Sequence, residues 1–334
     1  MIRSWIFSLS KGWQMRTRFA SALVISLVFL PSLVGAEETV NYGVQPTMSP
    51  IYIARALGML APIEKKDNVK IVFRNFQNGP IENEAMAAHE LQIASEGTGP
   101  ALVAVSRLPA TLIGIDILGQ SAILVRSDSD IKTMADLKGK RVGYGGVGTQ
   151  QYPMMLKALA GVGLKESDIT LFKTDLSQIP TLLQQKSIDA GLTYDPYVSE
   201  ALIGGYARVL LTADTIMPIM QGHYIGNGEY VSNDFLKRRP DVVQDVVDAI
   251  VRATDFINKN PSDAAKLWAK EIGIPENVIL FSLTKHISIY SRDIAPNRAG
   301  IDAYVQLLRE AKILSDSDVP KVDPSFANRA SAAK

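Results

Sequence analysis

The sequence has 334 residues, with 35 lysine and arginine side chains, 34 acidic side chains, three histidines and no cysteine. The missing cysteine excludes a disulfide framework, a thiolate metal site and the lipid anchor of exported proteins that carry a cysteine at the cleavage site. The balanced charge shows no strongly basic segment of the kind that binds nucleic acid, so we expect no nucleic-acid partner.

Residues 1–36 predict a secretory signal peptide. They carry four basic residues and no acid, with an apolar run over 19–30 and the small residues 34-VGA-36 before the expected cut at Glu37. The apolar run is shorter than the roughly 20 residues of a membrane span, and no later segment is long enough, so we expect no stable membrane insertion. Translation could begin at Met1 or Met15. We expect a freely diffusing periplasmic monomer.

Cleavage removes 36 of 334 residues and four of 35 basic side chains, which leaves 298 residues with 31 basic and 34 acidic side chains. This length predicts two domains. Short apolar strands alternate with amphipathic helices, which is typical of an α/β fold with mostly parallel sheets. The expected strands are 39–45, 69–73, 91–95, 111–116, 122–126, 141–144, 169–172, 188–194 and 207–211. The expected helices between them are 50–57, 81–89, 99–106, 149–160, 177–186 and 196–203.

Beyond residue 233 the pattern contains helices only. Residues 241–259 place Val243, Val246, Val247 and Ile250 on one helical face. Two further helices are expected at 263–271 and 301–311. Residues 320–334 are polar, and we expect a poorly ordered tail there.

The segment 141-RVGYGGVGTQQYPMML-156 contains Gly143, Gly145 and Gly148 at the spacing of a dinucleotide-binding turn. Such a site needs an acid at the end of the next strand, about 20 residues after the glycines. Asp168 precedes that strand, and Asp175 lies 27 residues beyond Gly148, so neither acid fits. A dinucleotide site is therefore disfavoured.

Two interpretations of this loop remain open. In the first, Thr149 caps a helix whose free backbone N–H groups, at Gln150, Gln151 and Tyr152, bind a small anion. In the second, the glycines only make a tight turn and Thr149 is only a helix cap. The sequence of the loop alone does not separate them.

Six segments occur in a characteristic order: 50-PIYIARALGML-60, 79-GP-80, 97-GTGPAL-102, 136-DLKGKRVG-143, 186-KSIDAGLTYDPY-197 and 240-PDVVQDVVDAIVRATDFINKNP-261. Together they resemble the extracytoplasmic binding proteins for aliphatic sulfonates, nitrate and taurine, from about Thr39 to Leu314. The resemblance implies a type II-like periplasmic-binding-protein fold, in which two lobes joined by two crossover strands hold a small-molecule anion and deliver it to an ABC permease. Lobe one would be 37–120 plus 222–334, and lobe two 121–221.

Binding residues are expected at the carboxyl ends of parallel strands, where loops of α/β sheets meet a ligand. The candidates are Gln45, Thr47, Met48, Gly79, Gly97, Thr98, Gly148, Thr149, Gln150, Gln151, Tyr194 and Asp195, with His223 where the chain returns to lobe one. Most are neutral hydrogen-bonding or small residues, and no arginine clamp is evident. This set favours a monoanion over a sulfate-like dianion.

Some of these residues also have purely structural interpretations. Asp195 before Pro196 could cap a helix, or it could accept from a ligand amine such as that of taurine. His223 could donate to a ligand oxygen or make a structural hydrogen bond. The family often has Trp-Asp-Pro-Tyr where this chain has 194-YDPY-197, so the ligand size is left open.

The leading expectation is a binding protein for an aliphatic sulfonate or sulfate ester, without enzymatic activity and without a cofactor. Taurine, nitrate and thiamine precursors are alternatives for the same fold. A fungal pyrimidine synthase of related fold uses a cysteine-rich segment, which this chain lacks. A hydrolase would need a nucleophile with a base partner, and a transcription regulator would need a DNA-binding helix pair; neither is evident.

Overall fold

The structure is a computed structural model that describes residues 36–333. The expected signal peptide lies outside the described residues except for Ala36. In the described part, no helix is long and apolar enough to cross a membrane.

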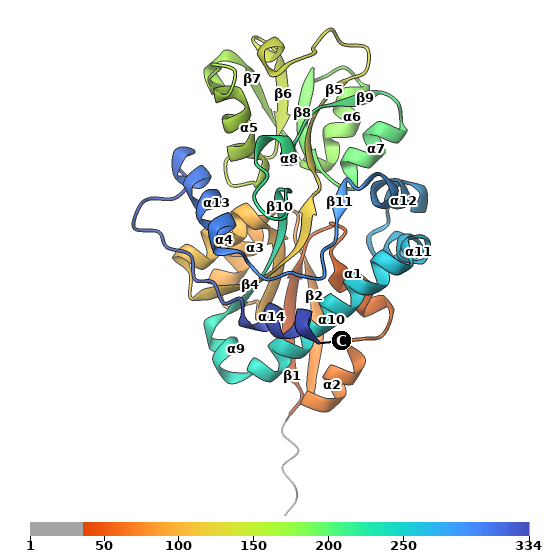
Figure 1. Cartoon of the computed structure of the whole chain (residues 1–334), viewed down its shortest axis with the longest axis vertical. Coiled ribbons are helices and arrows are strands. Elements are labelled where there is room, and N and C mark those ends of the chain that lie inside the picture. The colour runs from red at the N-terminus through yellow and green to blue at the C-terminus, as the bar shows by residue number, and fades with distance from the viewer. Residues whose placement is uncertain (1–35, 334) are drawn as a thin grey trace, which may run out of the picture. The chain divides into compact units, whose positions relative to one another are not determined.

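Two mixed sheets organise the chain, and we call the part built on each sheet a lobe (Figure 1). The sheet of lobe one has the order β11-β4-β10-β3-β1-β2. Its strands are β1 (Glu38–Val44), β2 (Val69–Asn75), β3 (Ile93–Gly97), β4 (Ala110–Gly119), β10 (Ile225–Ser232) and β11 (Ser288–Ile289). The sheet of lobe two has the order β7-β6-β8-β5-β9. Its strands are β5 (Ser121–Arg126), β6 (Arg141–Tyr144), β7 (Thr170–Lys173), β8 (Ala190–Tyr194) and β9 (Ala207–Thr212).

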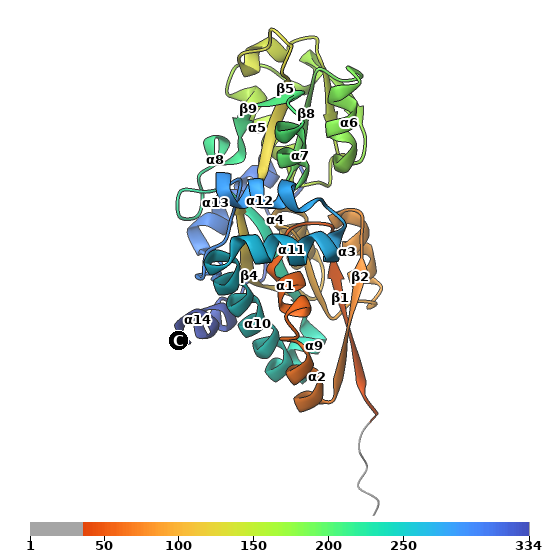
Figure 2. The ribbon, with the colours of Figure 1, turned by 90° about the vertical axis from the view of Figure 1, so that its right-hand side faces the viewer.

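Helices cover both faces of the six-stranded sheet, because β4 alternates its side chains between them. Leu112 packs into a cluster with α3 and α4, while Ile113 packs into a cluster with α1, α10 and α11. The last three helices contact one another and lie side by side in Figure 2. The helices of lobe one are α1 (Pro50–Ala56), α2 (Ala61–Asp67), α3 (Gly79–Ala87), α4 (Thr98–Arg107), α9 (Asn233–Arg238), α10 (Pro240–Lys259), α11 (Pro261–Ile272), α12 (Glu276–Lys285), α13 (Arg298–Glu310) and α14 (Ser325–Ala332).

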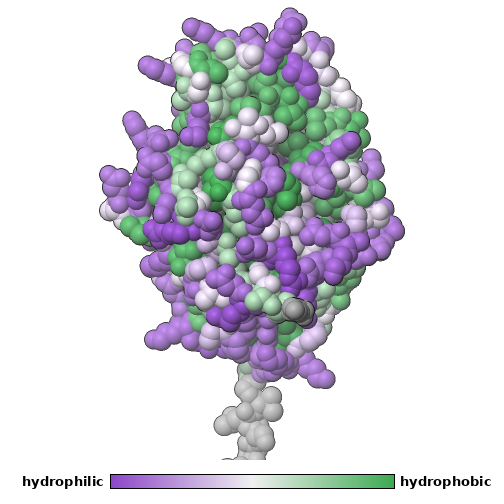
Figure 3. All heavy atoms as spheres, in the orientation of Figure 1, coloured by the Kyte–Doolittle hydropathy of each residue, from purple (hydrophilic) through white to green (hydrophobic). Residues whose placement is uncertain are grey.

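Lobe two is smaller and has fewer helices than lobe one. They are α5 (Gln151–Ala160), α6 (Ile179–Gln184), α7 (Tyr197–Ile203) and, on the way back to lobe one, α8 (Ala213–Ile216), with 3₁₀ helices at Met134–Leu137, Glu166–Asp168 and Leu176–Gln178. On the face shown in Figure 3, polar side chains cover most of lobe one, whereas lobe two carries apolar patches. Phe172 and Val162 are among its exposed apolar residues.

Two connections join the lobes, which confirms the expected crossovers. β4 ends at Gly119 and β5 begins at Ser121, so Gln120 alone separates the two sheets. Gln120 has a left-handed φ of 60°, and its backbone N–H donates to the carbonyl of Ile287 at 2.7 Å. The chain returns through α8 to β10. The lobe boundaries expected at residues 120/121 and 221/222 stay predictions.

The structure corrects three expectations about the elements. The sheets are mixed rather than mostly parallel. In lobe one, β1 is parallel to β2 and β3, while β10 is antiparallel to β3 and β4. In lobe two, β6 is parallel to β7 and β8, while β5 is antiparallel to β8 and β9. Strands do not cease at residue 233, since the short strand β11 follows at Ser288–Ile289. The polar tail is ordered as α14, because Phe326 and Ala330 bury their side chains in the core of lobe one.

Candidate functional site

A cavity lies between the two lobes, at the carboxyl ends of β1, β3, β6, β7 and β8. Its volume is about 80 Å³, well below the roughly 300–1,000 Å³ of pockets for drug-sized ligands. The lining residues are Gln45, Pro46, Thr47, Gln77, Asn78, Gly79, Gly97, Pro100, Gln120, Gly145, Thr149, Gln150, Gln151, Thr174, Asp175, Leu176, Ser177, Tyr194, Tyr197 and Asn227. The site therefore suits a small solute and not a dinucleotide.

The cavity brings together many of the residues predicted from the sequence. Those that line it are Gln45, Thr47, Gly79, Gly97, Thr149, Gln150, Gln151 and Tyr194. They come from loops far apart in the chain that converge where the sheets end. Their grouping follows directly from the strand pattern.

Three predicted residues lie beside the cavity without lining it. Met48 is fully buried in the core of lobe one, and its carbonyl accepts a hydrogen bond from Tyr290 Oη at 2.8 Å. Thr98 is the buried first residue of α4. Gly148 lies against Pro80 of lobe one, where a Cβ would approach Pro80 Cγ to 2.7 Å. Gly148 thus permits a close approach of the lobes.

Asp195 is also outside the cavity, and its contacts are structural. Oδ1 accepts from the backbone N–H of Ser199 at 3.0 Å and from Ser199 Oγ at 2.8 Å, in the first turn of α7. Oδ2 accepts from Ser282 Oγ and from Ser288 Oγ, both in lobe one. Burial raises the pKa of Asp195, while these hydrogen bonds lower it. Asp195 thus bonds to the first turn of α7, whose N-cap position is occupied by Pro196, and a contact of Asp195 with a ligand amine stays a prediction.

His223 belongs to the second crossover rather than to the cavity. Its Nδ1 lies 2.8 Å from Asp214 Oδ2. The other oxygen of Asp214 accepts the backbone N–H of Tyr224 at 2.8 Å. Both contacts fix the return connection, and a contact of His223 with a ligand oxygen stays a prediction.

The glycine loop differs from the expected capping geometry. Thr149 does not cap α5 with its side chain, because its hydroxyl donates to the carbonyl of Gly146 at 2.8 Å. Gln150 occupies the N-cap position with helical dihedral angles, and the N–H of Tyr152 donates to the carbonyl of Thr149 at 3.3 Å. Within residues 36–333, the N–H groups of Gln150 and Gln151 find no acceptor. Two donors, rather than three, are left to face a ligand.

Several buried polar atoms of the cavity lack a hydrogen-bond partner among the described residues. They are Thr47 Oγ1, Gln120 Oε1, Asn227 Oδ1 and both amide atoms of Gln150. A buried polar group without a partner costs about 1–3 kcal/mol, so such groups are usually completed by a ligand or by water. These atoms mark the polar surface that a ligand would contact.

Sequence analysis missed two of these residues. Gln120 follows β4 at the crossover, and its place after an apolar strand is a signal that could have found it. Asn227 lies inside β10, where 227-NGE-229 interrupts the apolar pattern, and no sequence signal marks it as facing the cavity.

The cavity contains little formal charge. Among the described residues that line it there is no lysine, arginine or histidine, and Asp175 is the charged side chain. Asp175 accepts a hydrogen bond from Gln77 Nε2 of lobe one at 2.6 Å, which bridges the lobes. In the described residues no cluster of three or more acidic or histidine side chains could hold a metal ion.

Two α/β lobes, two crossover connections and a small polar cavity between them define a protein of the periplasmic-binding-protein class. The chain belongs to the NMT1/THI5-like family, whose model matches residues 45–264.

Similar proteins include binding proteins and an enzyme. A relative from Escherichia coli strain K12, named as an aliphatic sulfonates-binding protein, is 26% identical over 247 residues, which cover 73% of this chain and 75% of the relative. The crystal structure of the periplasmic aliphatic sulphonate binding protein SsuA from Escherichia coli superposes with a TM-score of 0.69 at 25% identity, covering 84% of this chain and 95% of that one. The 4-amino-5-hydroxymethyl-2-methylpyrimidine phosphate synthase of Aspergillus parasiticus is 22% identical over 269 residues, with 76% of each chain covered.

Proposed function

We propose that this protein is an extracytoplasmic solute-binding protein that holds a small organic anion between its lobes and delivers it to an ABC permease. The favoured anion is an aliphatic sulfonate or a sulfate ester. The observation that carries the proposal is the start of α5, where Gln150 and Gln151 line the small interlobe cavity and their backbone N–H groups have no acceptor among the described residues.

The start of α5 suits a singly charged anion. A helix N-terminus carries about half a positive charge, and its free N–H groups point toward the ligand. The amide of Gln150, which is 3% exposed and lacks a partner among the described residues, adds a donor beside them. A sulfonate has one charge and three acceptor oxygens, which these neutral donors can satisfy.

Binding without turnover fits the cavity better than catalysis does. The described lining offers no histidine, lysine or cysteine, and its acid, Asp175, accepts a hydrogen bond from Gln77 and activates no lining hydroxyl in the part of the chain that the structure describes. A pyrimidine-synthase-like activity remains the second candidate, because an enzyme of that kind is among the similar proteins. Long incubation of the pure protein with the solute that binds in calorimetry, followed by mass spectrometry, separates the two, because a binding protein returns the solute chemically unchanged.

The cellular setting is part of the same proposal. An export signal cleaved near Glu37 would place the protein in the periplasm, where we expect a monomer. We also keep the proposal that lobe two spans about 121–221. N-terminal sequencing of periplasmic protein tests this location. An intact Met1 or Met15 on cytoplasmic protein contradicts it.

Calorimetry with ethanesulfonate, butane-1-sulfonate, methyl sulfate and nitrate tests the ligand class. Gln150 has φ −56° and is the second residue of the turn closed by Tyr152 N–H and the Thr149 carbonyl, where proline fits, so Gln150→Pro removes one N–H donor at the start of α5. Gln150→Ala is the matched control, since it loses the side-chain amide but keeps the N–H. We expect Gln150→Pro to bind the anion at least tenfold more weakly than Gln150→Ala. Equal affinities, or no binding of any of these anions by the parent protein, would refute the proposal.

A further inference from the structure

Two carboxyl groups are buried directly behind the wall that lobe one contributes to the cavity. Glu82 of α3 and Glu96 of β3 are both fully buried. Glu82 Oε2 accepts a hydrogen bond at 2.9 Å from Nε2 of Gln45, which lines the cavity. A Cβ on Gly79, another lining residue, would lie 2.3 Å from Glu96 Oε2. We call Glu82 and Glu96 the buried acid pair, and only the lining residues separate it from the cavity.

The buried acid pair has few hydrogen-bond donors. Glu82 Oε1 and both carboxyl oxygens of Glu96 lack a partner among the described residues. Tyr230 lies beside Glu96, but its hydroxyl donates to Asn83 Oδ1 at 2.8 Å. The Nδ2 of Asn83 in turn donates to the carbonyl of Pro100 at 3.0 Å. Because a buried carboxylate without donors is costly, both members of the pair favour the protonated, neutral form.

No positive charge compensates the buried acid pair in the part of the chain that the structure describes, since no lysine, arginine or histidine acts on either member. Burial raises the pKa of Glu82 to about 8 and raises that of Glu96 well above its ordinary value, and the charge of Glu82 raises the latter further. The titratable groups around the pair, on α1, β1, β4 and β10, are Tyr42, Tyr52, Tyr230, Asp116 and Glu229. The pair therefore holds its protons at neutral pH and begins to lose them in mildly alkaline solution.

Ionisation of the pair would put a negative charge just behind the cavity, where the proposed solute carries a negative charge as well. Two like charges separated by a protein wall repel more strongly than they do through water. Coupling between two binding equilibria is reciprocal. A bound anion must therefore make the pair harder to ionise, and ionisation of the pair must weaken binding of the anion by the same factor.

We propose that the buried acid pair makes solute binding proton-linked: the anion binds while the pair is neutral and is released when the pair ionises. This adds a regulation to the proposed function and rests on it. The affinity is fully present at neutral pH and below, and it falls as pH rises above about 8. One proton accounts for a loss of at most about tenfold per pH unit.

Calorimetry on the unmodified protein tests the linkage. Ethanesulfonate, butane-1-sulfonate, methyl sulfate and nitrate keep the same charge from pH 6.5 to 9.5, so a change in their affinity reports on the protein. We expect a constant affinity between pH 6.5 and 7.5 and a loss of about tenfold by pH 9.5.

A buffer comparison detects the proton itself. Tris and bicine carry no sulfonate group and ionise with different heats. At pH 8.5 the heat of binding should differ between them, because the complex takes up protons from the buffer. An unchanged affinity from pH 6.5 to 9.5, with equal heats in both buffers, refutes the linkage while the proposed function stands. If none of the four anions binds, both are refuted.

A double variant assigns the linkage to the pair. Glu82→Gln combined with Glu96→Gln keeps the size of both side chains and stays neutral, so we expect its affinity to be the same at pH 6.5 and 9.5. Glu84→Gln, exposed on α3, is the matched control and should follow the parent. If a double variant with a normal melting curve loses affinity at pH 9.5 as the parent does, the role of the pair is overturned. The buffer comparison decides on its own if the double variant does not fold.

Discussion

Asp195 and Ser288 link the two lobes: the carboxyl group at the end of β8 accepts a hydrogen bond from Ser288 Oγ of β11 at 3.1 Å. The same oxygen accepts from Ser282 of α12, and the other oxygen accepts from the backbone N–H of Ser199 in the first turn of α7. Asp195 is completely buried. Its role is therefore to fix lobe two against lobe one beside the first crossover.

Replacing Asp195 should destabilise the folded protein, but it should not change the relative affinities of the protein for different ligands. Asp195→Ala leaves three buried serine hydroxyls without their acceptor, and we expect a loss of about 3 kcal/mol in the free energy of unfolding. Urea unfolding measures it. The control is Asp263→Ala at an exposed site on α11, expected to change stability by less than about 0.5 kcal/mol. A loss below 1 kcal/mol for Asp195→Ala, roughly what a single neutral hydrogen bond contributes, would contradict this role.

Gly148 should matter for closure of the lobes. In Gly148→Val the new Cβ would meet Pro80 Cγ at 2.7 Å, so the lobes must separate. Overpacking of this kind costs about 1–3 kcal/mol, which lowers affinity by roughly tenfold. We expect weaker binding of the solute found by calorimetry, with a nearly unchanged melting temperature of the free protein. Gly161→Ala, at an exposed helical position of lobe two, is the control; parent-like affinity in Gly148→Val would show that the lobes do not need this approach.

Glu82 should make the stability fall as pH rises. Burial raises its pKa to about 8, although hydrogen bonds from Gln45 and the Ser95 backbone lower it. The unfolded chain loses this proton near its ordinary pKa of 4.5. The contribution is thus fully present below about pH 4.5 and is lost as pH approaches 8, with a slope of at most about 1.4 kcal/mol per pH unit.

Glu82→Gln tests this dependence because glutamine stays neutral. Urea unfolding at pH 5, 6.5 and 8 should give a flatter stability profile for Glu82→Gln than for the parent. Glu84→Gln, exposed on the same helix, should follow the parent. Parallel profiles for Glu82→Gln and the parent would show that Glu82 keeps an ordinary pKa in the folded protein.

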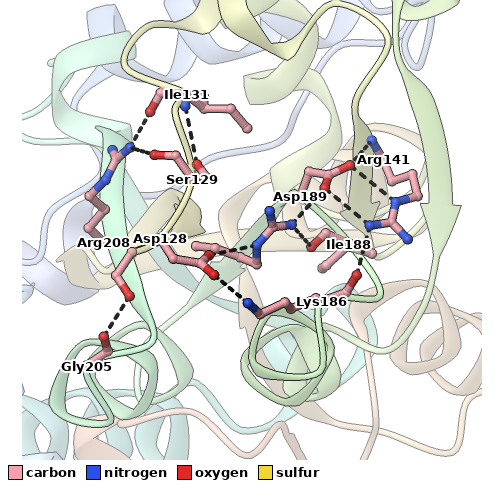
Figure 4. A network of polar contacts seen from close by, with 11 residues as sticks. Asp128, Ser129, Ile131, Arg141, Lys186, Ile188, Asp189, Gly205 and Arg208 are labelled. Atoms are coloured by element: carbon pink, nitrogen blue, oxygen red, sulfur yellow. Dashed lines mark hydrogen bonds and ion pairs between the residues drawn. The ribbon is translucent and has the colours of Figure 1, made fainter.

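Asp189 of lobe two lies in a network of charges (Figure 4). Its Oδ1 accepts from Arg126 Nη1 at 2.7 Å, and its Oδ2 accepts from the backbone N–H of Arg141 at 2.9 Å. Burial alone would raise the pKa of Asp189, but hydrogen bonds and charge from Arg141 and Arg126 outweigh it and hold the pKa well below its usual range. The stability from Asp189 is present above its unfolded pKa and is lost as pH falls.

Asp189→Asn should therefore destabilise lobe two at neutral pH. Because the network is partly exposed, solvent screening limits the expected loss to about 1 kcal/mol. The difference from the parent should persist at pH 7 and shrink below about pH 4, where the unfolded carboxyl group takes up its proton. Asp130→Asn, an exposed neighbour in the same lobe, is the control. If the stability difference between the parent and Asp189→Asn grows as the pH falls, the pKa of Asp189 is not lowered in the folded protein.

The C-terminal helix should contribute to stability, contrary to the disorder that its polar sequence predicts. Phe326 of α14 is 6% exposed and packs in the core of lobe one. Phe326→Ala should cost about 3–5 kcal/mol, whereas Asn328→Ala, exposed on the same helix, should cost little. Equal unfolding midpoints for the two variants would indicate that α14 does not dock in solution.

Sequence analysis found the elements with strong local patterns and missed those fixed by distant contacts. The apolar run 122-AILVR-126 predicts β5 almost to the residue. By contrast, β10 contains 227-NGE-229, whose buried side chains find partners on other strands: Asn227 Nδ2 donates to Asp116 and Ser95, and Glu229 accepts from Tyr42. Those partners cannot be inferred from a local window.

The candidate site shows the same division. Loops after predicted strands located Gln45, Thr47, Gln150 and Tyr194, because strand ends of an α/β sheet converge. The role of Asp195 depends on Ser288, which is 93 residues away. The sequence alone therefore could not decide between a structural role and a contact with the ligand. Thr149 was assigned as a cap from its residue type, and the actual bond to Gly146 depends on the local turn geometry.

Because the cavity contains little formal charge, ligand binding should depend only weakly on the salt concentration outside the cell. Attraction between separated charges in water fades as ionic strength rises, over a screening length of about 8 Å at physiological salt. Short hydrogen bonds from buried backbone and amide groups are shielded from mobile ions. A binding protein whose described cavity lining contains no lysine or arginine would therefore keep nearly the same affinity for its solute when the external salt concentration changes widely.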